Sequence, residues 1–201
     1  MDPIIHREVI NVLRFISAAA IVILFSGCAF TPQAVVIQPK VEGPASNIGK
    51  NQDLPLTVVD ERPRQTIGTR GARGVGAEMT IDGNISNIVR NALAEGLAQQ
   101  KFKVTAPGVN AASELRVEIR NLDYGVTVGF WAGSLRVDVG LKAICSRGNA
   151  RPYEMLHRGE HNESVQVVQS PEANNAYVSA AVSQAVNSLL KDEQLMKCLA
   201  P

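Results

Sequence analysis

The chain has 201 residues, of which 45% are hydrophobic and only 4% aromatic, so its core must consist mainly of aliphatic side chains. Its formal net charge is +1 at pH 7. This balance argues against a nucleic-acid-binding surface or a polybasic membrane-binding surface, because each needs a clear excess of Lys and Arg. The length fits one domain preceded by a leader.

Residues 1–27 have the layout of a secretory signal peptide. Two arginines precede an apolar segment, residues 15–25, which is too short to span a bilayer because a spanning helix needs about 20 residues. Ser26 and Gly27 then precede Cys28. This arrangement resembles the bacterial lipobox and implies cleavage before Cys28 and acylation of its thiol. An ordinary signal peptide followed by a chance cysteine is the alternative.

The lipobox predicts three parts of the chain: a removed leader (1–27), a lipidated tether (28–34) and a single periplasmic domain (35–201). Acyl chains contribute about 0.8 kcal/mol per buried methylene group, so several of them hold a protein at a membrane. Ala29 follows Cys28. In lipoproteins of this kind, a residue other than Asp at that position favours the outer membrane.

The first half of the domain predicts two strands, a polar loop and a helix. A Pro-containing tether, Thr31–Lys40, leads into an edge strand around Val35, and Leu54–Asp60 predicts a second strand. A long loop with four arginines follows. Apolar residues from Ile81 onward then recur at helical spacing, with Thr80 or Asp82 as the expected cap.

That helix is expected to end near Gln100 and to lead into a strand at Phe102–Thr105. A strand, a helix and a second strand in this order predict a parallel crossover connection.

The second half predicts a long hairpin, a third strand and a second helix. Apolar and polar residues alternate after Leu115 and again from Leu135 to Ala143. Arg151–Val168 predicts a more polar strand, near a sheet edge or bent at Gly159. Ser170, Pro171 and Glu172 are typical of a helix start, and Glu193–Leu199 predicts a further short turn. The predicted fold is therefore α+β, with one mostly antiparallel mixed sheet (β-β-α-β-β-β-β-α order) and two helices packed on one face.

The chain resembles the YajG-type bacterial lipoproteins. Besides the lipobox, the resemblance covers five short segments, Val58–Pro63, Ile67–Arg70, Val89–Leu93, Leu115–Leu122 and Ala180–Leu189. It implies no assigned activity, cofactor or site residue. Cys145 and Cys198 are not part of the family pattern.

No catalytic or metal-binding motif is complete. His157 to His161 matches H-x-x-E-H, but zinc binding by that motif needs a helix. In the strand predicted here, the two histidines lie about 13 Å apart on an exposed surface. A G-x-S-x-G motif is absent, and Gly71–Gly76 lacks the Lys of a phosphate-binding loop. We therefore expect no enzyme activity, no metal and no cofactor.

Five residues are the candidate ligand-binding side chains: Arg62, Arg64, Arg70, Arg73 and Trp131. The arginines present forked donors that suit carboxylates or phosphates. The alternative is an exposed, solvated loop in which Asp60 and Arg62 pair locally. The hairpin tip, which carries Trp131, the only tryptophan, is either an exposed binding element or folded onto the core.

We also predict a disulfide between Cys145 and Cys198. Cys145 keeps the phase of the core-facing residues of its strand, and Cys198 ends the C-terminal helical segment. The periplasm oxidises such thiols. Two separate thiols are the alternative.

These observations favour a lipid-anchored domain of the bacterial outer membrane that binds a ligand or assists envelope assembly without catalysis. Its membrane contact is the acylated Cys28, and its partner is peptidoglycan or an envelope protein rather than nucleic acid. A self-associating structural subunit is the first alternative, and a hydrolase with an unrecognised site is the second.

Overall fold

The computed structural model describes residues 31–71, 76–129, 132–165 and 169–201. The predicted signal peptide, Cys28, Arg73 and Trp131 lie outside these residues. The elements in chain order are β1 Gln33–Val35, β2 Asp53–Asp60, β3 Gly68–Thr69, β4 Glu78–Ile81, α2 Ile85–Gln99, β5 Lys103–Thr105, β6 Ser113–Val128, β7 Gly133–Arg147, β8 Tyr153–Val165, α3 Pro171–Leu190 and α4 Glu193–Leu199.

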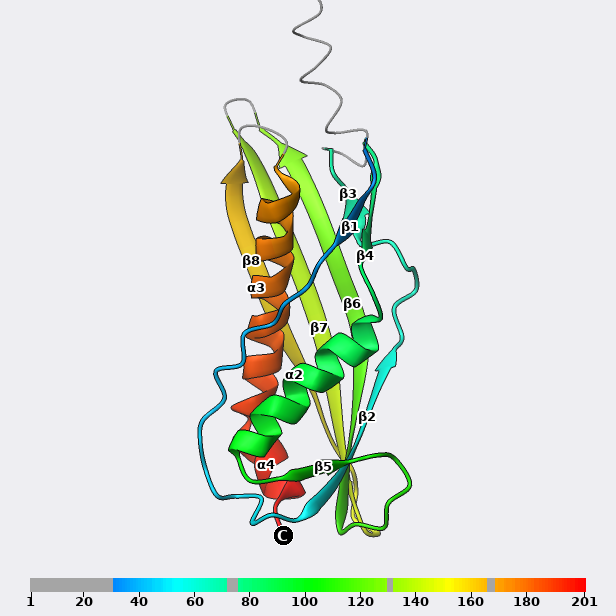
Figure 1. The fold of residues 1–201 in the computed structure, drawn as a ribbon, viewed down its shortest axis with the longest axis vertical. Coiled ribbons are helices and arrows are strands. Elements are labelled where there is room, and N and C mark those ends of the chain that lie inside the picture. The colour runs from blue at the N-terminus through cyan, green and yellow to red at the C-terminus, as the bar shows by residue number, and fades with distance from the viewer. Residues whose placement is uncertain (1–30, 72–75, 130–131, 166–168) are drawn as a thin grey trace, which may run out of the picture.

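Strand β6 is the centre of a branched mixed sheet. On one side it pairs with β7, which pairs with β8, and both pairings are antiparallel. On the other side β6 pairs in parallel first with β2, where Leu56 faces Leu115, and then with β3, where Gly68 faces Tyr124. Strands β4 and β1 extend the sheet beyond β3, and β5 extends it beyond β2. Figure 1 shows the long β6, β7 and β8 running the length of the domain.

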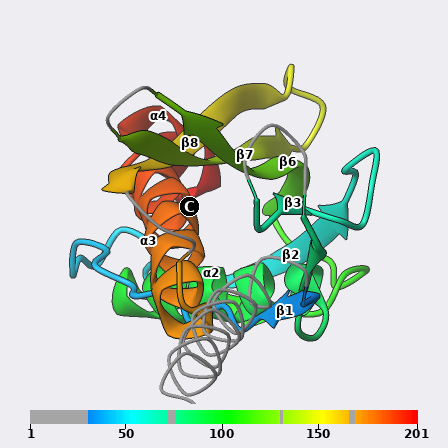
Figure 2. The same ribbon diagram turned by 90° about the horizontal axis from the view of Figure 1, so that it is seen from above.

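The helices lie against the inner face of this curled sheet. Figure 2 shows β6, β7 and β8 forming one wall, with α3 and α2 on the same side of it. The core between them is mainly aliphatic, as the composition predicted, and its largest fully buried side chains come from both layers: Leu54, Leu56, Ile67, Met79, Leu93, Leu97, Leu115, Ile119, Leu135, Leu141, Leu189 and Leu190. The α+β fold with a mixed sheet is therefore confirmed, and the short C-terminal turn is a third helix, α4.

The region before α2 differs from the prediction. Helix α2 begins at Ile85, and Asn84 is its cap, because the Asn84 side chain accepts a hydrogen bond from the amide of Asn87. Thr80 belongs to β4, and Asp82 precedes the cap. Ile81 pairs with Val35 in the sheet. Its apolar side chain fitted the helical period only by coincidence, since a single apolar residue satisfies either period.

Strand β8 lies at the edge of the described sheet, as one of the two alternatives predicted, and its pairing with β7 continues through Gly159 without a register shift. A Cβ atom at this position would collide with the carbonyl oxygen of Ala181 and would lie 2.6 Å from the amide nitrogen of Ala185. Gly159 is therefore the point at which the backbone of α3 makes its close approach to the sheet.

The predicted disulfide is present. Cys145, near the end of β7, is bonded to Cys198 in α4, with 6.4 Å between the Cα atoms. Cys145 is fully buried, as its phase in the strand indicated. The hydroxyl of Ser113 donates a 2.9 Å hydrogen bond to the carbonyl of Leu199. These contacts hold the C-terminus against the sheet.

Candidate functional site

Helix α3 presents three different faces. Its start is determined locally, because Ser170 accepts a hydrogen bond from the amide of Ala173 and Pro171 occupies the first turn. One face is apolar and fully buried against the sheet, and all the residues predicted for this stripe belong to it: Val178, Val182, Ala185, Val186 and Leu189. The other two faces form the candidate site.

The second face of α3 binds the extended segment Val36–Glu42, which we call the strap. Every second strap residue donates its backbone N–H to a side chain of α3: Val36 to Asn175 at 3.1 Å, Gln38 to Ser179 at 3.0 Å, Lys40 to Ser183 at 2.8 Å and Glu42 to Asn187 at 2.8 Å. Two residues of extended chain span about 6.6 Å and four residues of helix rise about 6.0 Å, so the two repeats stay in step.

The third face of α3 forms a groove beside the strap. The groove has a volume of about 830 Å³. Small, exposed residues of α3, including Ala176 and Ala180, line it, and the strap forms a second side. Its ends differ in charge, since Glu172 lies at the start of α3, whereas two lysines, Lys40 and Lys191, and one acid, Glu42, lie near its end.

The structure corrects the expectation of an exposed arginine loop at two positions. The side chain of Arg62 is only 3% exposed and forms two 2.8 Å hydrogen bonds to Asp60, which is the local pairing considered as the alternative. Arg70 is 5% exposed and donates to the backbone carbonyls of Thr31 and Gln169. Arg64 alone of the three described arginines is exposed, where it pairs with Asp123.

A smaller cleft of about 320 Å³ lies at the start of α2 and includes Asp60 and Arg62 in its lining. The hydrogen bond from Arg62 lowers the pKa of Asp60. Because Asp60 is ionised and neutralises Arg62, this cleft offers no excess charge to an anion.

His157 and His161 lie in strand β8, as predicted, but they are not on its exposed face. His157 is 5% exposed, and the ring of His161 stacks on Tyr177 of α3, with 4.7 Å between the ring centroids. His157, Gly159 and His161 occupy alternate positions of β8 on the face that packs against α3. Among the residues that the structure describes, no three His, Cys, Asp or Glu side chains are grouped to hold a metal ion.

His157 also lies between a serine and an aspartate that sequence reasoning had not connected. Its Nδ1 is 3.4 Å from the hydroxyl of Ser188, and its Nε2 is 3.4 Å from a carboxylate oxygen of Asp192 without forming a hydrogen bond. That carboxylate instead accepts from Tyr153 at 2.8 Å and from the amides of the first turn of α4. Asp192 therefore caps a helix rather than orienting the imidazole.

Comparison with known proteins places the chain in a family. A family model described as uncharacterized lipoprotein, Lipoprotein_16, matches residues 39–200. The chain belongs to this lipoprotein family. The YajG-type resemblance is thereby confirmed. The search of curated proteins finds no match.

Solved structures similar to this chain include three bacterial proteins. A DUF330 protein from Xanthomonas campestris is 14% identical with a TM-score of 0.48, and the match covers 80% of this chain and 92% of that one. A minor lipoprotein from Acinetobacter baumannii is 10% identical with a TM-score of 0.40, covering 76% and 98%. The lipoprotein GNA1162 from Neisseria meningitidis is 13% identical with a TM-score of 0.34, covering 68% and 99%.

Family membership implies attachment to a membrane through lipid. Within the described part of the chain, no helix is both long enough and apolar enough to cross a bilayer.

Proposed function

We propose that this protein is a non-enzymatic lipoprotein of the bacterial outer membrane, anchored through Cys28, that binds an extended segment of a partner polypeptide in the groove beside α3. The observation that carries the proposal is the set of four hydrogen bonds from the strap backbone to side chains of α3, which we call the polar ladder. It demonstrates that the polar side chains of this helix recognise an extended backbone at a repeat of two residues.

The dimensions of the groove support this occupant. Helix α3 has 20 residues and is therefore roughly 30 Å long, which corresponds to about nine residues of extended chain. The small side chains of Ala176 and Ala180 leave room for a backbone to approach the helix. The opposite charges of Glu172 and Lys191 favour one direction of the bound chain, which gives specificity as well as attraction.

A second copy of the chain is a poorer occupant. In an antiparallel pair of α3 helices, Glu172 of each copy would lie near Lys191 of the other, but the two lipid tethers would then leave from opposite ends of the pair. In a parallel pair both tethers would reach one membrane, but like charges would face each other. A separate partner meets neither obstacle.

Hydrolysis is also less well supported. In a serine hydrolase the imidazole accepts the serine proton while a carboxylate holds its other nitrogen. Here the Asp192 carboxylate is engaged by Tyr153 and by α4, and burial of His157 lowers the pKa of its ring. The arrangement is better explained as packing between β8, α3 and α4.

A photo-crosslinking amino acid at Ala180 in intact cells tests the proposal. Ala98 is the matched control, because it is an exposed alanine on α2 outside the groove. We expect an adduct with one partner at Ala180 but not at Ala98, mapped by mass spectrometry to a single segment. Lys191→Glu should reduce its yield. An adduct with a second copy supports self-association instead, and equal yields at the two positions contradict groove binding.

A further inference from the structure

We propose that the end of the domain carrying Thr31 rests on a zwitterionic phospholipid surface, so that α3 and its groove begin near the membrane at Glu172 and run away from it rather than lying along it. This inference rests on the anchor at Cys28 in the proposed function. It does not depend on what binds in the groove.

The tether is too short to let the domain move far from the bilayer. Thr31 follows Cys28 by only three residues. Even a fully extended chain spans at most about 3.6 Å per residue, so Thr31 lies within roughly 11 Å of the acylated cysteine.

The fold also holds the tether as soon as it reaches the described residues. Arg70 is buried and donates to the carbonyl of Thr31 at 3.3 Å and to that of Gln169, just before α3, at 3.1 Å. Two residues later, the side chain of Gln33 donates to the carbonyl of Pro171 at 3.0 Å and accepts from Asn174 at 2.9 Å. The fold therefore fixes the point at which the tether leaves the domain, at Thr31.

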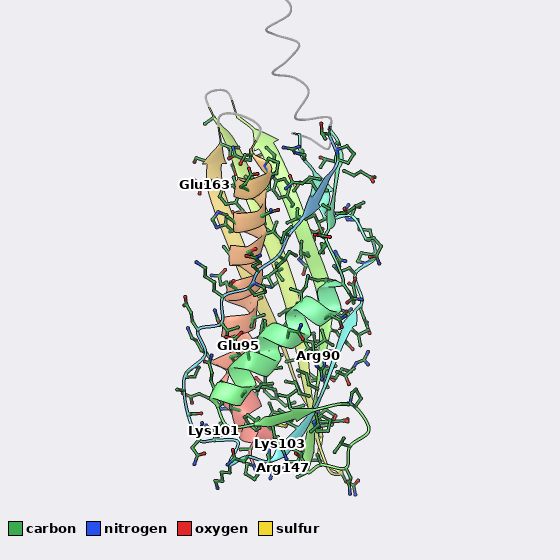
Figure 3. All side chains as sticks on the ribbon, viewed as in Figure 1. Arg90, Glu95, Lys101, Lys103, Arg147 and Glu163 are labelled. Carbon is green, nitrogen blue, oxygen red and sulfur yellow. A yellow bond between two sulfur atoms is a disulfide. The ribbon has the colours of Figure 1, made fainter. Side chains whose placement is uncertain are left out.

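The two ends of the domain are far apart. Strand β1, the start of α3 and the hairpin end of β6 and β7 lie together at the end where the tether enters, whereas the C-terminus lies at the other (Figure 1). Strand β7 runs between them and, with 15 residues, is roughly 50 Å long. Figure 3 shows Lys101, Lys103 and Arg147 at the far end.

The tether end suits contact with lipid head groups better than the outer face of the sheet does. The described residues at the tip of the hairpin, Gly125–Thr127 and Ala132–Leu135, include no charged residue; Glu163, opposite Leu135 in the sheet, and Glu172, at the start of α3, are exposed acids at this end. The outer face instead carries ion pairs such as Arg116–Glu118 and Lys142–Glu154. Laying these on a bilayer would remove water from charged groups at a cost, so contact through the end is favoured.

The experiment uses the acylated full chain in phosphatidylcholine vesicles that contain a quencher on the lipid head group. Ser134→Cys places a fluorescent label near the tether end, and Asn149→Cys places the same label in the exposed turn after β7 at the far end. In each variant the introduced thiol is the single free one, because Cys28 is acylated and Cys145 is bonded to Cys198.

We expect strong quenching at Ser134 and essentially none at Asn149. Inserting six Gly and Ser residues between Phe30 and Thr31 should reduce the quenching at Ser134. Equal quenching at both positions would show that the domain lies flat, and no quenching at either would show that it stands off the lipid, so each result overturns the orientation. Failure of the protein to float with the vesicles overturns the anchor itself, whereas loss of groove crosslinking with normal quenching overturns only the groove function.

Discussion

Replacing Gly159 by alanine should force α3 away from the sheet. The added Cβ atom would collide with the carbonyl oxygen of Ala181 and lie 2.6 Å from the amide nitrogen of Ala185. Both atoms belong to the backbone of α3, so no side-chain rotation can relieve the overlap. Heavy atoms prefer separations of about 3.5 to 4.0 Å, so the contact with Ala185 alone requires α3 or β8 to move by about 1 Å, and the collision with the carbonyl of Ala181 requires more.

Overpacking of a core typically costs about 1 to 3 kcal/mol, and a rigid helix lying along β8 places Gly159→Ala near the upper end of that range. For a domain of this size, about 3 kcal/mol corresponds to a fall in melting temperature of roughly 6 to 12 °C. Urea unfolding followed by circular dichroism measures the free energy of unfolding directly.

The matched control is Gly125→Ala in β6. A Cβ atom there has no neighbour within 4 Å. Since alanine restricts the unfolded chain more than glycine does, we expect a gain of about 0.4 to 1 kcal/mol. If the two variants are equally stable, β8 and α3 are not in contact at Gly159, and the account of this glycine is wrong.

Three other predictions concern stability. Removing the disulfide by replacing Cys145 and Cys198 with serine should lower the free energy of unfolding by up to about 4 kcal/mol, since the bond closes a loop across 53 positions; equal urea midpoints would contradict this. Ser170→Ala removes the cap of α3 and should cost about 1 kcal/mol in the same assay. Burial lowers the pKa of His157 from 6.5, so the unfolded chain binds its proton more readily; stability should fall as pH drops below about 6.5, and His157→Gln should reduce this slope in unfolding curves across pH.

The sequence predicted the long elements because their signals are local. Alternating residues identified β6 and β7, and the serine, proline and acid at the start of α3 identified that helix. The disulfide followed from the phase of Cys145 in its strand. In each case a few neighbouring residues contained the information needed.

Features determined by distant residues were missed. Strands β3 and β4 have only two and four residues, and they form because the sheet offers them partners. Arg70 is buried because two backbone carbonyls, at Thr31 and Gln169, lie beside it, although these residues are 39 and 99 positions away in sequence. Nothing near Arg70 in the sequence distinguishes it from the exposed Arg64.

The polar ladder of α3 explains why the groove in particular could not be predicted. A stripe of Asn175, Ser179, Ser183 and Asn187 resembles an ordinary solvated helix face, since short polar side chains usually face water. In the structure these side chains do not simply face water. The backbone amides of the strap donate hydrogen bonds to their oxygens at every fourth residue of the helix. A helix with one apolar face would bind the sheet equally well but would leave the strap unheld. The sequence of α3 therefore specifies a contact with the strap in addition to the contact with the sheet. The strap follows the tether and lies along the groove that we propose as the binding site.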